Sequence, residues 1–165
     1  MDSAANSEPR LDVGEEAPDF NVDTTDGRAT LGALVNDAKE GVIVYFFPKA
    51  GTPGCTKEAV DFQDAHHLLK EAGYTVIGIS PDSMAALEKF QAKQGLDFPL
   101  GSDVDHHIME RWGVWGTKKN YGRTYQGVIR STFVINKEGR IALAQYNVRA
   151  TGHVARLLKA LGLAA

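Results

Sequence analysis

The pattern of apolar and polar positions along the chain predicts strands and helices in alternation. Residues 42–47 form an unbroken apolar run, Val-Ile-Val-Tyr-Phe-Phe, which is typical of a strand covered on both faces. After this run, apolar residues recur at helical spacing over 59–69, and Gly73 marks the expected end of that helix. Residues 74–80 are again mostly apolar and β-branched. We therefore expect a buried strand, a helix and a second buried strand in succession.

A further helix and two shorter elements are predicted in the middle of the chain. Asp82 or Ser83 can cap a helix that carries apolar residues at helical spacing and ends near Gly95. A short extended piece is expected over 97–100, and another helix over 104–112. Together these elements continue the alternation that the first half of the chain began.

An antiparallel pair of strands and a last helix close the predicted domain. The strands cover 131–135 and 140–146, and the residues between them, Asn-Lys-Glu-Gly, favour a turn. Residues 154–161 carry apolar side chains on one helical face. Near the start, two short segments within 20–31 flank an Asp-Gly pair and suggest a small hairpin. This order of elements describes a three-layer α/β domain.

Composition narrows the class of protein. A chain of 165 residues suits one domain, which we place at 11–165; the lead-in over 1–10 lacks the apolar core of a signal peptide and is expected to be disordered. The net charge is −3 with both signs interspersed, which argues against nucleic acid or anionic lipid as a partner. No apolar run approaches the roughly 20 residues that span a bilayer. A single cysteine also disfavours a disulfide-stapled secreted protein, so we expect a cytoplasmic one.

The one cysteine, Cys55, lies where the predicted strand gives way to the predicted helix. The strand stops at Pro48, a loop rich in Gly, Thr and Pro follows, and the thiol arrives as the helical pattern begins. That position offers backbone N–H groups and the positive end of a helix, which favour a thiolate. On this pattern alone, a reactive thiol and an inert buried cysteine are equal alternatives. In either case no internal disulfide can form, so a redox cycle must take its second thiol from another molecule.

The segment 48–55 fits the pattern Pro-x-x-x-Thr-x-x-Cys, and with Glu58 it resembles the peroxiredoxins, in particular the branch called peroxiredoxin Q or bacterioferritin comigratory protein. The likeness spans about residues 11 to 163. It implies a thioredoxin-like α/β domain of three layers, with a central mixed sheet and flanking helices. Four further stretches carry the resemblance: 13–20, 76–80, 112–116 and 127–133.

The resemblance implies a role for each of five residues. Cys55 would attack a hydroperoxide and become a sulfenic acid. Pro48 would shield the site, Thr52 would contact the peroxide, Arg130 would lie beside the thiolate, and Glu58 would orient that arginine. From local sequence alone each has an ordinary alternative, since the threonine suits a turn or helix cap, the proline a strand end and the arginine a surface position. The glutamate falls in the expected first turn of the helix, where the dipole favours a carboxylate.

One position departs from the pattern of the branch. Many members carry a resolving cysteine five residues after the first, and here that position is Val60. The chain therefore resembles a one-cysteine version. The implied partners are a hydroperoxide substrate and an external thiol, either a low-molecular-weight thiol or a thioredoxin- or glutaredoxin-like protein. The resemblance also implies a monomer or weak dimer and no cofactor, and it leaves open whether the helix carrying Cys55 unwinds.

Activation of the thiol alone cannot make a fast peroxidase. For thiols in general, lowering the pKa from about 8.5 to about 6 raises the thiolate fraction at pH 7 roughly 30-fold. The thiolate also becomes about 13-fold less nucleophilic, so the net gain is only about twofold. The larger share must come from donors aimed at the reacting oxygens, for which the candidates are Arg130, Thr52 and the backbone N–H groups of the loop.

Two other functions are open to a chain with one reactive thiol. A thiol–disulfide transferase would favour a Cys-x-x-Cys pair, which is absent. A peroxide sensor or redox-regulated holdase would use the same thiol without efficient turnover.

The histidine pairs 66–67 and 106–107 lie near aspartates, but adjacent histidines on a helix point in different directions, so we expect no metal site. The aromatic residues between 112 and 125 are expected to pack in a loop that could wall the substrate pocket.

Overall fold

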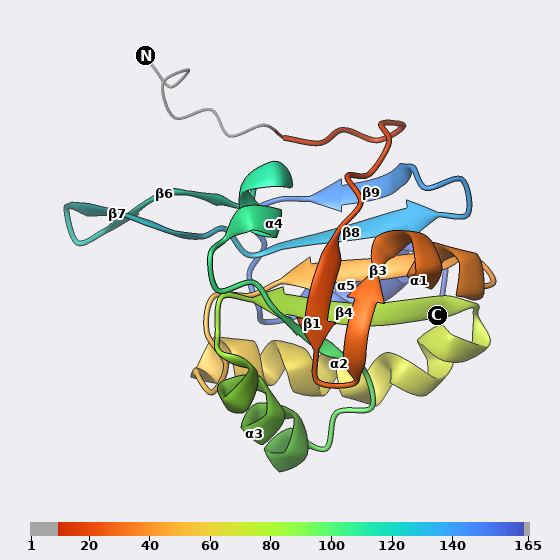
Figure 1. Cartoon of the computed structure of the whole chain (residues 1–165), viewed down its shortest axis with the longest axis horizontal. Helices are drawn as coiled ribbons and strands as arrows, with labels where there is room; N and C mark the ends of the chain where they lie inside the picture. The colour runs from red at the N-terminus through yellow and green to blue at the C-terminus, as the bar shows by residue number, and fades with distance from the viewer. Residues whose placement is uncertain (1–9, 164–165) are drawn as a thin grey trace.

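A seven-stranded mixed sheet forms the middle of the protein in the computed structural model, which describes residues 10–163 (Figure 1). The strand order is β2-β1-β5-β4-β3-β8-β9. Neighbours β3, β4 and β5 run parallel, and the other neighbouring pairs are antiparallel. The strands are β1 (Asn21–Thr24), β2 (Gly27–Thr30), β3 (Gly41–Phe46), β4 (Tyr74–Ser80), β5 (Leu100–Ser102), β8 (Ser131–Asn136) and β9 (Ile141–Gln145).

Helices cover both faces of this sheet. The buried side chains of α2, α3 and α5 join one apolar cluster, and those of α1 and α4 join the other. The sheet lies between the two clusters, so the chain has three layers, as the sequence predicts. The helices are α1 (Leu31–Asp37), α2 (Pro53–Glu71), α3 (Met84–Gln94), α4 (His107–Arg111) and α5 (His153–Ala160).

The central strand β3 explains the unbroken apolar run. All six of its residues are buried. Val44 and Phe46 point into the cluster under α1 and α4, whereas Ile43 and Tyr45 point into the cluster under α2, α3 and α5. Because successive side chains of a strand alternate between faces, a strand covered on both sides needs apolar residues at every position. The prediction of a doubly covered strand is confirmed.

Two predicted elements in the middle of the chain are displaced or shortened. The extended piece expected over 97–100 is found as β5, which starts at Leu100. The helix expected over 104–112 reduces to α4, because His106 has a left-handed backbone (φ 60°) that interrupts any helix before it. The carboxylate of Asp103 instead accepts hydrogen bonds from the backbone N–H groups of Ile108 and Met109. Asp103 thus stabilises the start of the shortened helix.

Two elements were not predicted. The helix α1 has only seven residues and begins at Leu31; Thr30 caps it, with Oγ1 accepting a hydrogen bond of 3.2 Å from the N–H of Ala33. The second is a hairpin of β6 (Trp115–Asn120) and β7 (Arg123–Val128), which pair only with each other and project away from the main sheet (Figure 1). The expectation of a packed loop over 112–125 is therefore wrong beyond Trp115, because most of β7 is exposed. The strand was not predicted because its residues show no alternation of apolar and polar positions.

The remaining elements agree with the sequence. The opening hairpin is β1 and β2, the antiparallel pair is β8 and β9, and the last helix is α5. The expected disordered lead-in lies outside the described residues, except for Arg10. Among the helices of the described chain, none combines the length and apolar character needed to cross a membrane.

Candidate active site

Cys55 is the third residue of α2, and the loop 47–52 connects that helix to β3. Pro53 occupies the first helical position, where its missing N–H costs nothing and its fixed φ suits the helix. The first backbone N–H groups of a helix have no intrahelical acceptor, so the thiol lies at the positive end of α2. The cysteine is only 1% exposed and is a free thiol.

Sheet topology brings Arg130 to this thiol from a distant part of the sequence. Strand β8 runs antiparallel to β3, and its first residue, Ser131, pairs with Phe46 at the end of β3. Arg130 directly precedes Ser131, so it lies where the loop to Cys55 begins. Its Nη2 donates to the Sγ of Cys55 over 3.3 Å. The N–H of Val148 donates to the carbonyl of Arg130 over 2.9 Å, which also fixes its backbone.

Glu58 holds the other side of the guanidinium. The Nη1 of Arg130 donates to Oε1 of Glu58 over 2.6 Å, and the carboxylate is fully buried. Because α2 begins at Pro53, Glu58 lies in the second turn of the helix. The expectation that it lies in the first turn is therefore wrong. It follows Cys55 by three residues, so both face the arginine from one side of the helix.

Burial and charge act in opposite directions on this pair. Burial raises the pKa of Glu58 to about 7, although Arg130 acts to lower it. Burial on its own would lower the pKa of Arg130, but the charges of Glu58 and Cys55 outweigh this effect and keep the pKa above its ordinary value. The guanidinium therefore stays charged beside the thiol.

Thr52 and Pro48 lie in the loop before the helix. Thr52 has the extended backbone of a helix cap, but its hydroxyl makes no capping hydrogen bond. Its Oγ1 instead donates to the carbonyl of Lys49 over 2.8 Å, which leaves the oxygen free to accept. Pro48 is half-buried and stands between buried Phe47 and the exposed lysine. The proline ends the apolar run, as expected of a strand end.

An aspartate from the neighbouring strand end fixes the loop. Oδ2 of Asp82 accepts a hydrogen bond of 2.7 Å from the N–H of Ala50 and another of 2.7 Å from the hydroxyl of Ser80. Of the two capping candidates for α3, Ser83 is the cap, with its Oγ accepting from the N–H of Ala86. Asp82 was not predicted to support the site. The signal was available, because parallel strands β3 and β4 end at the same sheet edge.

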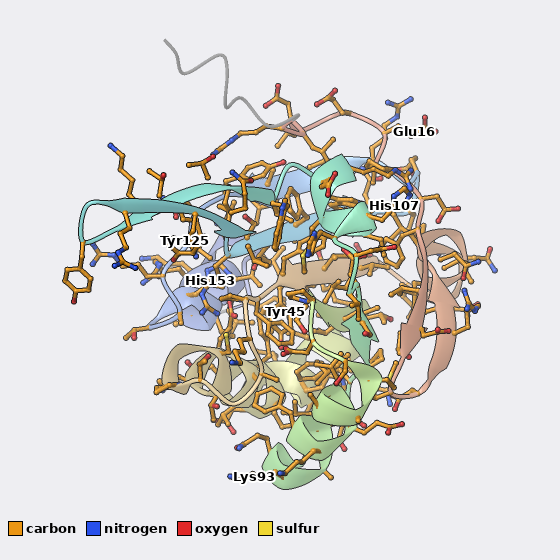
Figure 2. The ribbon with its side chains drawn as sticks, turned by 60° about the vertical axis from the view of Figure 1, so that its left-hand side comes forward. Glu16, Tyr45, Lys93, His107, Tyr125 and His153 are labelled. Atoms are coloured by element: carbon orange, nitrogen blue, oxygen red, sulfur yellow. The ribbon has the colours of Figure 1, made fainter. Side chains whose placement is uncertain are left out.

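Tyr45 is a second residue that the sequence did not single out. Its ring stacks on Phe62 with centroids 4.4 Å apart, one turn of α2 beyond Glu58, and Figure 2 shows it in the interior. Among the described residues, neither its hydroxyl nor Oε2 of Glu58 has a hydrogen-bond partner. Burial raises the pKa of Tyr45, and the nearby charges of Glu58 and Cys55 raise it further. Tyr45 therefore stays neutral beside the carboxylate.

Two more side chains approach the site from other elements. The Nε2 of His153, at the start of α5, lies 2.7 Å from Oγ1 of Thr132 on β8, and burial lowers the pKa of this histidine to about 4. Lys118 on β6 donates from Nζ to the carbonyl of Val128 over 2.9 Å. Burial and Arg130 lower the pKa of Lys118, whereas Cys55 acts to raise it.

A pocket of about 290 Å³ opens on the outer side of the loop, between Ala50 and Gly51 and the face of α3. Its wall includes Phe90 and two lysines but neither Cys55 nor Arg130. Within residues 10–163, no three His, Cys, Asp or Glu side chains gather into a possible metal site.

Known proteins are similar to this chain in sequence. The chain matches the AhpC/TSA family over residues 13–144. A protein of Mycobacterium tuberculosis that carries a peroxiredoxin name is 49% identical over 154 residues, covering 93% of this chain and 97% of the relative. Peroxiredoxin Bcp of Bacillus subtilis is 40% identical over 152 residues, covering 92% of this chain and 95% of the relative.

Solved structures agree with the sequence relatives. The bacterioferritin comigratory protein of Xanthomonas campestris superposes with a TM-score of 0.82 at 35% identity, covering 92% of this chain and 98% of that one. The predicted thioredoxin-like fold with a mixed sheet is thereby confirmed. The single Cys55 fits a one-cysteine member. The chain therefore belongs to the AhpC/TSA family as a peroxiredoxin of the Bcp or peroxiredoxin Q branch, and it is a thiol-dependent peroxidase.

Proposed function

We propose that Cys55 reduces hydrogen peroxide and organic hydroperoxides through a sulfenic acid. The thiolate Sγ attacks one peroxide oxygen, an S–O bond forms, and the O–O bond breaks. The leaving oxygen takes a proton and departs as water or an alcohol, and Cys55 keeps the other oxygen as a sulfenic acid. The Xanthomonas campestris relative is described by its alkyl peroxide reduction activity, which supports including organic substrates.

The single observation that carries this proposal is the contact of 3.3 Å between Nη2 of Arg130 and Sγ of Cys55. A guanidinium fixed in this position stabilises the thiolate before attack and the negative charge that develops on the peroxide during it. Glu58 keeps the fork in place through its hydrogen bond of 2.6 Å and therefore acts as a positioning residue.

Thr52 has a defined part in the proposal. Because its hydroxyl donates to the carbonyl of Lys49, its oxygen is placed to accept a hydrogen bond from the peroxide O–H. This contact would orient the O–O bond toward the sulfur. Pro48 shapes and shields the entrance at the end of the buried run without reacting itself.

An external thiol completes the cycle. A donor thiol attacks the sulfenic sulfur and forms a mixed disulfide while water leaves, and a second thiol attacks the donor sulfur and releases Cys55. The chain has no other cysteine, and the position of a resolving thiol is Val60. The donor is a low-molecular-weight thiol or a thioredoxin- or glutaredoxin-like protein. A reducing compartment such as the cytoplasm would supply it, with the enzyme acting as a monomer or weak dimer.

Steady-state turnover tests the proposal against the alternative of a peroxide sensor or holdase. Reduced enzyme is given hydrogen peroxide or an alkyl hydroperoxide with a large excess of dithiothreitol, and peroxide loss is followed over many equivalents. The proposal expects many turnovers per Cys55 and none in a Cys55→Ser variant. Consumption that stops after one equivalent while the thiol donor is still present would favour a sensor.

A further inference from the structure

The β6–β7 hairpin carries positive charge without any negative charge. Between 115 and 128 the chain has Lys118, Lys119 and Arg123 and no Asp or Glu. The wider segment 111–137 contains six Lys and Arg residues and no acidic residue, although the whole chain has a net charge of −3. The expectation that both signs are interspersed is therefore wrong for this part of the molecule. Its charge is suited to an acidic surface.

The tip of the hairpin displays a tyrosine in a costly conformation. Tyr121 has a left-handed backbone (φ 52°) and is followed by Gly122 (φ 79°). Turns with two such residues favour Asn and Gly, and a bulky residue in this region is uncommon. Packing does not explain the choice, because Tyr121 is 98% exposed; Tyr125, further along β7, is 47% exposed. A left-handed tyrosine that no packing contact requires is therefore a basis for a functional hypothesis.

The base of this hairpin lies at the candidate active site. Strand β7 ends at Val128, two residues before Arg130, and the N–H of Ile129 donates to the carbonyl of Val114 over 2.6 Å. Lys118 also holds this end of the hairpin through its hydrogen bond to the carbonyl of Val128. Its pKa responds to the charges of Arg130 and Cys55. From there the two strands run outward, with Tyr125 along the arm (Figure 2). The hairpin therefore joins the site to an exposed basic and aromatic surface.

We infer that the β6–β7 hairpin is the docking arm for the protein that supplies the resolving thiol, and that this donor has an acidic surface beside its reactive cysteine. This inference rests on the proposed function and names the partner of the same site. Exposed tyrosines and an arginine along a ribbon offer the residue types that dominate protein–protein contacts. A small thiol would use a pocket, and no hairpin residue lines the pocket beside the loop. A second copy of this chain could offer only one thiol, its own Cys55, whereas reduction of the sulfenic acid needs two.

The docked reaction has a balanced form. One donor thiol and the Cys55 sulfenic acid give a mixed disulfide and water, with the donor sulfur bonded to Sγ. The second donor thiol then attacks the donor sulfur of that bond, so the donor leaves as a disulfide and Cys55 recovers its thiol. The donor dithiol is oxidised by two electrons and the sulfenic acid is reduced by two.

The test compares a protein donor with a small one on the same oxidised enzyme. The probes are a thioredoxin with net negative charge around its Cys-x-x-Cys pair, and dithiothreitol. The variants are Lys119→Glu with Arg123→Glu, and Tyr121→Gly, which relieves the strained backbone and so should not impair folding. A matched control reverses two exposed charges outside both the hairpin and the pocket beside the loop, Lys39→Glu with Lys159→Glu.

We expect both hairpin variants to slow reduction by thioredoxin about 10- to 100-fold, with a smaller dependence on salt in the charge variant. Oxidation by peroxide and reduction by dithiothreitol should be unchanged, and the control should match the parent. Parental rates with thioredoxin would overturn the inference. Equal losses with both donors, a change in self-association instead of rate, or no reduction of the parent by thioredoxin while dithiothreitol works would do the same. If the parent formed no sulfenic acid at all, the proposed function itself would fail.

Discussion

Arg130 donates a hydrogen bond of 2.6 Å to the buried carboxylate of Glu58, and this pair sets the position from which the guanidinium meets Cys55 at 3.3 Å. One planar group thus contacts two acidic partners through two different nitrogens. A lysine could not do so, because its single charged nitrogen cannot occupy both places.

Arg130→Lys should slow sulfenic acid formation by roughly 10²- to 10³-fold, the usual cost of losing one preorganised donor. The positive charge remains, but one ammonium group cannot replace the two guanidinium contacts to Sγ of Cys55 and Oε1 of Glu58. Stopped-flow oxidation by hydrogen peroxide measures the effect. The same substitution at exposed Arg123 is the control and should leave oxidation unchanged. A parental rate in Arg130→Lys would show that the fork does not contribute.

Thr52→Val should reduce the same rate by about 10²-fold, and Thr52→Ser should stay near the parental rate. Valine keeps the shape of the side chain but removes the oxygen that we propose accepts a hydrogen bond from the peroxide. Since Thr52 makes no side-chain capping bond, little of the loss should come from helix stability. Urea unfolding of both variants checks this point, and equal oxidation rates for valine and serine would count against the contact.

Glu58 makes the fold less stable as the pH rises. Its pKa is about 7 in the folded protein and 4.5 ordinarily, so between these values the folded state binds more protons than the unfolded state. Stability therefore falls with rising pH across this window, by on the order of 3 kcal/mol. The measurement is the free energy of unfolding of the parent minus that of Glu58→Gln between pH 4.5 and 7. A difference that stays flat or rises with pH would contradict the buried ionisation.

His153 has the opposite effect at lower pH. Its pKa is about 4 when folded and 6.5 ordinarily, so the unfolded state binds more protons between these values and stability falls as the pH drops. Urea unfolding from pH 6.5 to 4 should show that the free energy of unfolding falls more in the parent than in His153→Gln. Exposed His107→Gln is the matched control and should track the parent. Parallel curves for the parent and His153→Gln would refute the buried neutral histidine.

The sequence predicted those features that a local pattern of residue types determines. The apolar run over 42–47 specified a strand covered on both faces, and the antiparallel pair at 131–146 placed Arg130 at the start of a strand. Neither pattern contained the distance to Cys55, which depends on β8 lying beside β3 with Ser131 opposite Phe46. That register is a long-range packing result.

The residues that sequence reasoning missed are those whose role depends on a neighbour. Tyr45 stands in a run where every position is apolar, so nothing marks its face toward Glu58. Asp82 and Ser83 can both cap a helix, so the sequence offered both as caps of α3. Only the hydrogen bond from the N–H of Ala50 shows that Asp82 supports the loop while Ser83 caps the helix. The hairpin that carries Tyr121 is polar on much of its surface, so it has no periodic signal.

Cys55, held by Arg130, should be a fast peroxidatic thiol, and stopped-flow oxidation of the reduced protein measures this rate. Hydrogen peroxide is added and the oxidised protein is examined by dimedone trapping and intact mass. We expect oxidation far faster than that of a free thiol, with one oxygen added and one dimedone adduct at Cys55. Oxidation as slow as that of free cysteine, or no adduct at Cys55, would contradict it.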